Sequence, residues 1–250
     1  MKRSLALVIA GLAAIPLAAH ADLMDMGKSA LQSYAGNGGS SGGGNASLGA
    51  GLSDGQIGSG LKEALRVGTQ KAVATVGHSG GFLNDRNVHI PLPGPLEKVR
   101  SGLALVGASG MADDLEQRIN RAAEAAAPKA AVIFGNAVSS MSISDARGIL
   151  TGPRDSATQF FKRTTTPELT GAMKPIIDQS LANVGALKSY TALTQKVSTL
   201  PLGSSVNLDL SSYVVHKTLH GIFFYLAQQE AAIRTNPAAR TTDLLRSVFK

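Results

Sequence analysis

Residues 77–81 carry the pattern Gly-x-Ser-x-Gly, with Ser79 at its centre. In α/β-hydrolases this pattern forms the nucleophile elbow, a tight turn between a strand and a helix that exposes the serine hydroxyl. Residues 82–93 read as a loop that cannot supply this helix, and no alternating strands follow. We therefore favour a helix end followed by a glycine turn over a serine hydrolase.

His216 and His220 stand four residues apart in a helical segment, a spacing that places both imidazoles on one face. The zinc-protease version of this pattern needs a glutamate after the first histidine as general base, and here that position is Lys217. Zinc sites take three or four protein ligands. We therefore predict no metal and no cofactor, with these two histidines as the remaining candidates for metal ligands.

Polar residues interrupt two apolar helical stripes. Asn120 and Glu124 share a helix face four residues apart, and Arg121 lies beside them. Later in the chain, Glu230 falls on an apolar stripe, where a carboxylate is costly unless it is paired. Either cation nearby is a candidate partner, namely Arg234 or Arg240.

These polar residues admit two interpretations. One is a pocket of carboxylate and guanidinium groups that holds a carboxylated or phosphorylated ligand. The other is a buried network that fixes how the helices dock. Because structural ion-pair networks imitate functional sites, we favour the second.

The elements that must position these residues are helices. From Ser53, a plausible N-cap, apolar residues recur at three- and four-residue steps. This period predicts an all-α, single multi-helix domain over residues 53–250, with about nine or ten helices. Pro153 and Pro167 are each expected to open a helix, and the longest helix is expected over residues 209–234.

One short segment of the domain, residues 87–93, looks extended. Val88 and Ile90 alternate with polar residues there, but Pro91 and Pro93 confine the segment to a sheet edge or a loop.

The N-terminus has the pattern of an export signal. Lys2 and Arg3 precede an apolar run at 5–17 that is too short to span a bilayer, and Ala-His-Ala ends at Ala21. We expect cleavage after Ala21 and a periplasmic protein with no transmembrane helix after cleavage. Residues 22–52 are expected to form a short amphipathic segment and a Gly/Ser-rich flexible linker.

The composition excludes several classes of protein. The 250 residues are 44% hydrophobic and 16% charged, without cysteine, which excludes a collagen, a coiled-coil rod and thiol catalysis. Cleavage removes Lys2 and Arg3 from 24 basic residues and leaves 22 against 17 acidic ones, a charge of +5. Because the basic residues form no dense run, we expect no nucleic-acid partner.

Several blocks of residues follow one another in a recognisable order along the chain. They are GLKEAL at 60–65, GF at 81–82, IPLP at 90–93, NRAAE at 120–124, DARGIL at 145–150 and IRTNPAART at 233–241. Together these blocks resemble the bacterial domain-of-unknown-function family 4197. The resemblance runs from about Ser53 to the end of the chain and implies an exported protein of one domain with no established activity. His220 stands where we expect an acidic residue in the family.

Two functions follow as hypotheses. The first is a non-enzymatic binding or envelope-associated module, whose partner is an envelope protein or a small anionic or apolar ligand. The alternative is an enzyme with Glu124 or Glu230 as general base, in which Arg121, Arg234 or Arg240 binds an anionic substrate. The enzyme requires these groups to converge in a water-accessible cleft.

Overall fold

The computed structural model describes residues 53–98, 100, 109–183, 185–198 and 209–236. The chain divides into two units, Met1–Asn45 and Ala46–Lys250, and every described residue belongs to the second. The expected signal peptide, the linker and Arg240 lie outside the described residues.

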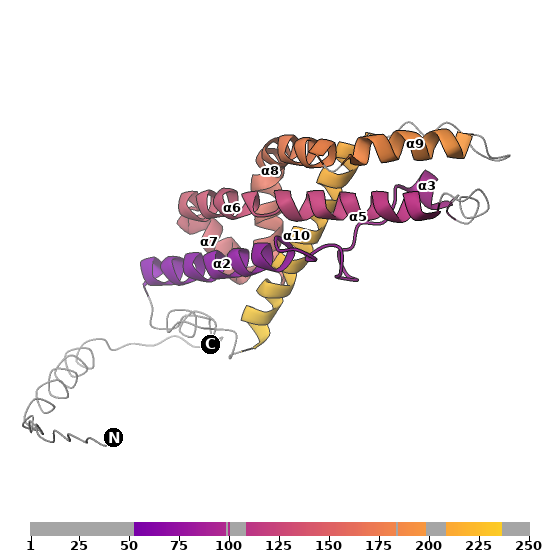
Figure 1. Ribbon diagram of the computed structural model, residues 1–250. Coiled ribbons are helices and arrows are strands. Elements are labelled where there is room, and N and C mark those ends of the chain that lie inside the picture. Colours follow the sequence, from indigo (N-terminus) through magenta and orange to yellow (C-terminus); the bar gives the residue numbers. More distant parts are fainter. Residues whose placement is uncertain (1–52, 99, 101–108, 184, 199–208, 237–250) are drawn as a thin grey trace, which may run out of the picture. The chain divides into compact units, whose positions relative to one another are not determined.

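The described residues form helices and turns, which confirms the all-α prediction for this part of the chain. They hold seven helices of nine residues or more together with the five-residue α3, fewer than the nine or ten expected (Figure 1). The helices are α2 Asp54–Val76, α3 Gly94–Lys98, α5 Ser109–Ala126, α6 Lys129–Ser140, α7 Ile143–Thr151, α8 Ser156–Asn183, α9 Ala186–Ser198 and α10 Leu210–Thr235.

The helix starts follow local side-chain chemistry. Ser53 accepts a hydrogen bond from the Gln56 backbone N–H while the Gln56 side chain accepts one from the Ser53 N–H, which is a capping box. At α10 the Asp209 side chain caps the helix by accepting a hydrogen bond from the Ser212 N–H, without the reciprocal bond of a capping box. The sequence therefore predicted the start of α2 and the span of α10 to within a residue, but α10, with 26 residues, is shorter than α8, with 28, and is not the longest helix as expected.

The expected helix start at Pro167 is wrong, because α8 continues through both Pro167 and Pro175 without ending. A proline inside a helix removes one backbone hydrogen bond and costs about 3 kcal/mol. Along α8, however, every fourth residue from 161 to 181 is buried. Tertiary packing of this continuous stripe outweighs the local preference and joins two expected helices into one.

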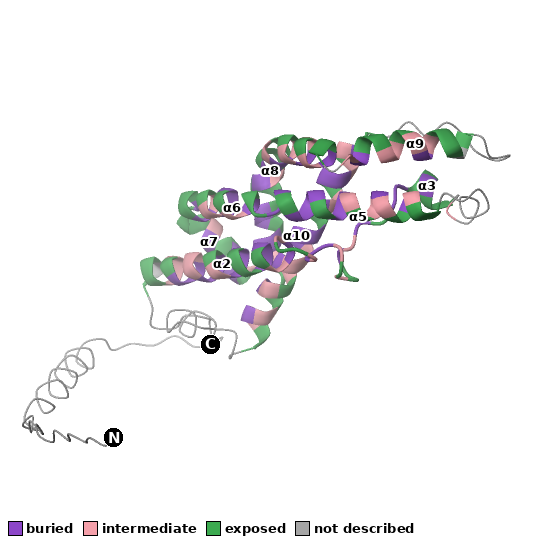
Figure 2. Ribbon diagram, viewed as in Figure 1, coloured by how far each residue is buried: buried purple, intermediate pink, exposed green. Residues whose placement is uncertain are grey.

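The core lies where α10 crosses α2, α5 and α8 (Figure 1). Buried positions occur along α10 from Leu210 to Ile233 (Figure 2), and they are densest over residues 218–223, which overlap the apolar run at 219–226. Phe134 packs edge-on against Phe161 with ring centroids 5.1 Å apart, and Phe223 lies 6.1 Å from Phe134. Helices α6, α8 and α10 thus share one aromatic cluster.

Gly221 of α10 allows the closest approach in this core. The ring of Phe82, fully buried, lies over it, and a Cβ atom added at Gly221 would meet Phe82 Cε1 at 2.5 Å. Phe82 belongs to the segment between α2 and α3, residues 77–93. This connection is therefore part of the core, although it has no helix of its own.

The Gly-x-Ser-x-Gly pattern is the end of α2 followed by a glycine turn, which confirms the simpler interpretation. The Gly77 N–H donates to the Val73 carbonyl 2.8 Å away. Gly80 has a φ of +87°, in the left-handed region that favours glycine. Ser79 is exposed and turns follow it, so the strand-to-helix setting of a nucleophile elbow is missing from this segment.

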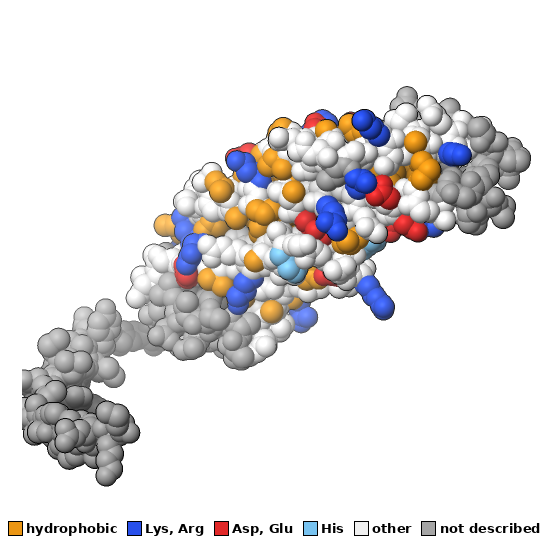
Figure 3. Space-filling model, viewed as in Figure 1, with side chains coloured by type: hydrophobic (Ala, Val, Ile, Leu, Met, Phe, Trp, Pro, Cys, Tyr) orange, Lys and Arg blue, Asp and Glu red, His pale blue; other side chains and the backbone are white. Residues whose placement is uncertain are grey.

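The surface of the described domain mixes charges of both signs. On the face seen in Figure 3, basic and acidic side chains are interspersed rather than gathered by sign. Among the described residues, no helix combines the length and the apolar character that crossing a membrane requires.

Candidate functional site

Three side chains at four-residue intervals on α5 hold the 77–93 segment. They are Glu116, Asn120 and Glu124, and four-residue spacing places them on one helix face. Each bonds a different part of the segment, which the next paragraphs describe in turn. The sequence analysis selected two of the three, and Glu116 continues the same spacing by one step.

Glu124 holds the start of the segment. Its Oε1 atom accepts hydrogen bonds from the backbone N–H groups of Phe82, at 3.1 Å, and Leu83, at 3.0 Å. The residue is 7% exposed. Buried backbone N–H groups outside a helix must find acceptors, and this carboxylate supplies one for two of them.

Asn120 holds the end of the segment and is fully buried. Its Oδ1 accepts from the Ile90 N–H at 2.9 Å, and its Nδ2 donates to the Ile90 carbonyl at 2.8 Å. The amide therefore pairs with one residue as a neighbouring strand would. Arg121, the next residue, is exposed and lies apart from this contact.

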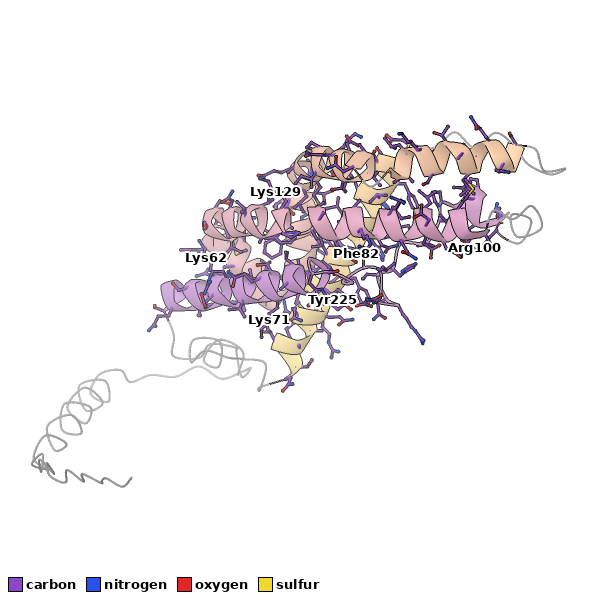
Figure 4. All side chains as sticks on the ribbon, viewed as in Figure 1. Lys62, Lys71, Phe82, Arg100, Lys129 and Tyr225 are labelled. Atoms are coloured by element: carbon purple, nitrogen blue, oxygen red, sulfur yellow. The ribbon has the colours of Figure 1, made fainter. Side chains whose placement is uncertain are left out.

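Glu116, the first of the three α5 side chains, bonds His89 of the segment and also Arg100. His89 Nε2 lies 2.7 Å from Glu116 Oε1, and His89 Nδ1 lies 2.9 Å from the Leu83 carbonyl oxygen. Both ring nitrogens face oxygen acceptors, so only a doubly protonated ring donates to both. Arg100, near the α3 end of α5 in Figure 4, bonds the other oxygen of Glu116.

Two tyrosines of α10 hold the same segment from the other side. The Tyr225 hydroxyl donates to Asp85, and this hydrogen bond holds the pKa of the Asp85 carboxyl below its ordinary value. Burial raises the pKa of Tyr225. Tyr213 donates to the Pro91 carbonyl at 3.0 Å, and burial raises its pKa too.

Glu230 forms a second buried network at the start of α8. It is 7% exposed and accepts from the backbone N–H groups of Ala157, at 2.9 Å, and Thr158, at 2.8 Å. The Thr158 hydroxyl donates to it as well, at 2.8 Å. A carboxylate at a helix N-terminus satisfies otherwise unpaired N–H groups and interacts favourably with the helix dipole.

Arg234 is one of the two partners that the sequence analysis offered for Glu230, and the other, Arg240, lies outside the described residues. Its Nε and Nη2 atoms lie 3.1 and 2.9 Å from Glu230 Oε1. The same Nη2 donates to the Ile149 carbonyl, in α7, at 2.8 Å. This ion pair therefore holds α7, α8 and α10 together, as a docking network would.

Within the described residues, the two buried carboxylates lie in separate networks, because their hydrogen-bond partners differ: Glu124 bonds Phe82 and Leu83, whereas Glu230 bonds the start of α8 and Arg234. The cavity beside Glu230 and Arg234 has a volume of about 20 Å³, which is room for about one water molecule. The convergent cleft that the enzyme hypothesis requires does not form from the described members of the set.

The two histidines of α10 do not meet further ligands within the described part of the chain. His216 and His220 are both exposed. The described residues contain no group of three or more His, Cys, Asp or Glu side chains placed to hold a metal ion.

Two hollows of the described surface adjoin one another along α8. One, of about 360 Å³, lies between α7 and the start of α8, and the other, of about 390 Å³, lies between α6 and α8. Both are lined by Asp145 and Phe160. We call the two together the α8 groove. Its lining also includes Asn136, Ser140, Met141, Gly148, Asp155, Ser156, Gln159, Arg163, Thr164 and Glu168.

Local chemistry shapes the groove at Asp145. Its Oδ2 accepts from the N–H of Ser142, which caps α7, while the Ser142 hydroxyl accepts from the Asp145 N–H. Hydrogen bonds from Ser142, and the charge of Arg163 to a lesser extent, hold the pKa of Asp145 below its ordinary value. The sequence analysis used residues 145–150 as a family block without assigning them a site.

The described residues thus define an all-α domain with two buried carboxylate networks and one open groove. The chain belongs to the family described as "Protein of unknown function (DUF4197)", whose model matches residues 51–250. This match confirms the resemblance found in the sequence. No curated protein and no solved structure matches the chain.

Proposed function

We propose that this protein is an exported binding module that holds its ligand in the α8 groove and catalyses no reaction on it. One observation carries the proposal. The cavities of the groove measure about 360 and 390 Å³, within the range of ligand sites, whereas the space beside Glu230 is about 20 Å³.

The groove is pre-formed, because hydrogen bonds from Arg234 and Glu230 of α10 fix the two helices that form its walls. Arg234 bonds the Ile149 carbonyl in α7, and Glu230 bonds the first turn of α8. One ion pair therefore fixes the wall on each side of the first cavity. A pre-formed site loses little conformational entropy on binding, which suits a binding module.

The state of the carboxylates supports binding without catalysis. A general base must lie within hydrogen-bond reach of the substrate proton. Glu124 and Glu230 are buried, and each accepts from two backbone N–H groups. These hydrogen bonds explain why both carboxylates are buried, and the explanation needs no catalytic role.

Export rests on the first 21 residues. The positive pair Lys2 and Arg3, the apolar run and the Ala-His-Ala site have the order of a secretory signal. N-terminal sequencing of the protein from a periplasmic fraction tests this part, and we expect a chain that begins at Asp22. A chain that retains residues 1–21 and stays in the cytoplasmic fraction would contradict export.

Two glycines make a matched pair for testing the groove. Gly148 lines the first cavity and Gly171 lies outside the groove on α8; both are exposed, and a Cβ atom at either meets nothing within 4 Å. Gly148→Trp therefore fills the groove without a backbone clash. Gly171→Trp adds the same side chain elsewhere.

Native mass spectrometry of the exported chain, purified gently, measures the outcome. We expect extra mass that denaturation removes from the native protein and from Gly171→Trp, but that Gly148→Trp lacks. Thermal unfolding verifies that both variants fold. Extra mass retained equally by both variants would contradict the groove as the site, and a bare chain even after incubation with envelope extract would contradict binding itself.

A further inference from the structure

We infer that the α8 groove takes an extended peptide segment that carries lysine or arginine side chains. The inference rests on the proposed function and adds the chemistry of the ligand. It is carried by the hydrogen-bonding capacity, the charge and the length of the groove.

Three hydroxyl groups in the groove already donate their hydrogen atoms to backbone carbonyl groups. Ser140 donates to the Asn136 carbonyl at 3.0 Å, Thr164 to the Phe160 carbonyl at 2.9 Å, and Ser156 to the Pro153 carbonyl at 2.7 Å. A hydroxyl has one donor and two acceptor lone pairs. These three side chains therefore offer a ligand acceptors alone.

The ionised groups of the groove are mostly acidic. Three carboxylates line it, those of Asp145, Asp155 and Glu168, against the single cation Arg163. Asp155 accepts from the Gln159 side-chain amide at 2.8 Å, which also occupies a donor. Glu168 is exposed and makes no hydrogen bond or ion pair with the residues that the structure describes. A donor-rich cation is the complement of such a lining.

The floor and length of the groove favour a peptide over a small ammonium ion. Phe160 and Met141 are apolar and line the floor, and the aliphatic stems of lysine and arginine pack on such surfaces. From Ser156 to Glu168 the lining of α8 covers twelve residue steps, or about 18 Å at 1.5 Å per residue. An extended chain covers this distance with about five or six residues.

Backbone NMR titration of the exported chain tests the inference with named probes. The probes are three hexapeptides that alternate serine with lysine, glutamine or glutamate, and the polyamine spermidine. We expect the lysine peptide alone to shift the amide signals of groove residues such as Gly148 and Glu168. Because exposed charges are screened by salt, its affinity should also fall as ionic strength rises.

A matched pair of variants on α8 tests the charge directly. Glu168→Gln removes the exposed carboxylate of the groove, and we expect the dissociation constant of the lysine peptide to rise about two- to fivefold. Asp178→Asn removes an acid of the same helix outside the groove, where it faces Lys174. We expect this control to leave the dissociation constant unchanged.

Each other outcome overturns the inference in a distinct way. Groove shifts with the glutamate or glutamine peptide at equal affinity would remove the cationic preference and leave the proposed function standing. Equal binding of spermidine would replace the peptide by a small polyamine. No shift with any probe would refute the inference. The native mass spectrometry experiment would then still test separately whether the groove binds a ligand.

Discussion

Glu230→Gln is the sharpest test of the network behind the groove. The replacement keeps the size of the side chain but exchanges one oxygen for an NH₂ group. If this group takes the place of Oε2, it faces the Thr158 N–H. If it takes the place of Oε1, it faces the Ala157 N–H and Arg234. A donor meets a donor in either orientation.

The expected loss of stability follows from burial. The Arg234 side chain is 15% exposed and that of Glu230 is 6% exposed, so Glu230→Gln removes a negative charge from a largely buried ion pair. Breaking such a pair costs about 3–5 kcal/mol, and an unsatisfied buried N–H accounts for about 1–3 kcal/mol of it. We expect the free energy of unfolding to fall by about 3–5 kcal/mol.

Urea unfolding followed by circular dichroism measures this change, with an unaltered denaturant dependence showing that the same surface unfolds. Glu168→Gln is the control, because this exposed glutamate has no such contacts, and its effect should stay within about 0.5 kcal/mol. A loss below about 1 kcal/mol in Glu230→Gln would refute the reasoning, since an open, solvated carboxylate would behave that way.

Three further outcomes test the 77–93 segment. Gly221→Ala should lower the free energy of unfolding by about 1–3 kcal/mol, because the new methyl group meets the Phe82 ring; urea unfolding measures it. Tyr225→Phe removes the main cause of the lowered pKa of Asp85. Its destabilisation, about 1 kcal/mol at pH 7, should shrink as pH falls below about 3.9, the ordinary carboxyl value, and unfolding at pH 7 and pH 3 reveals this sign. Asn120→Ala should speed tryptic cleavage within the segment, because it loses both bonds to Ile90.

Each of these tests has a control in the chain. Gly58→Ala meets nothing within 4 Å and should not destabilise the protein. Tyr213→Phe loses a bond to a carbonyl, so its effect should not follow the titration of Asp85. Arg121→Ala, beside Asn120 but exposed, should leave cleavage of the segment unchanged. Equal effects in a variant and its control would mean that the specific contact is not the cause.

Local chemistry is what the sequence could predict. Ser53 and Asp209 cap their helices through residues three positions away, and Arg234 reaches Glu230 across one helical turn. Such contacts depend on helical periodicity alone. For the same reason, the face shared by Asn120 and Glu124 was predictable.

Distant partners were not predictable. Glu124 bonds the backbone of residues 41 and 42 positions away, and Glu230 bonds that of residues 72 and 73 positions away. Backbone N–H groups carry no signature in the sequence, so only the packing of the helices shows which ones a carboxylate meets. The α8 groove could not be predicted for the same reason, because it forms only where α6, α7 and α8 pack together. At Pro167 the buried stripe of α8 outweighed a correct local rule.

The central claim, that the α8 groove holds a partner in the cell, is tested most directly by photo-crosslinking in the living envelope. Benzoylphenylalanine replaces Thr164, which is exposed and lines the groove, or Gln70, an exposed residue of α2 that lines none of the described cavities. We expect a discrete crosslinked product from position 164 alone, which Gly148→Trp abolishes. Crosslinks from position 70 alone, or a product from position 164 that persists in Gly148→Trp, would contradict the claim.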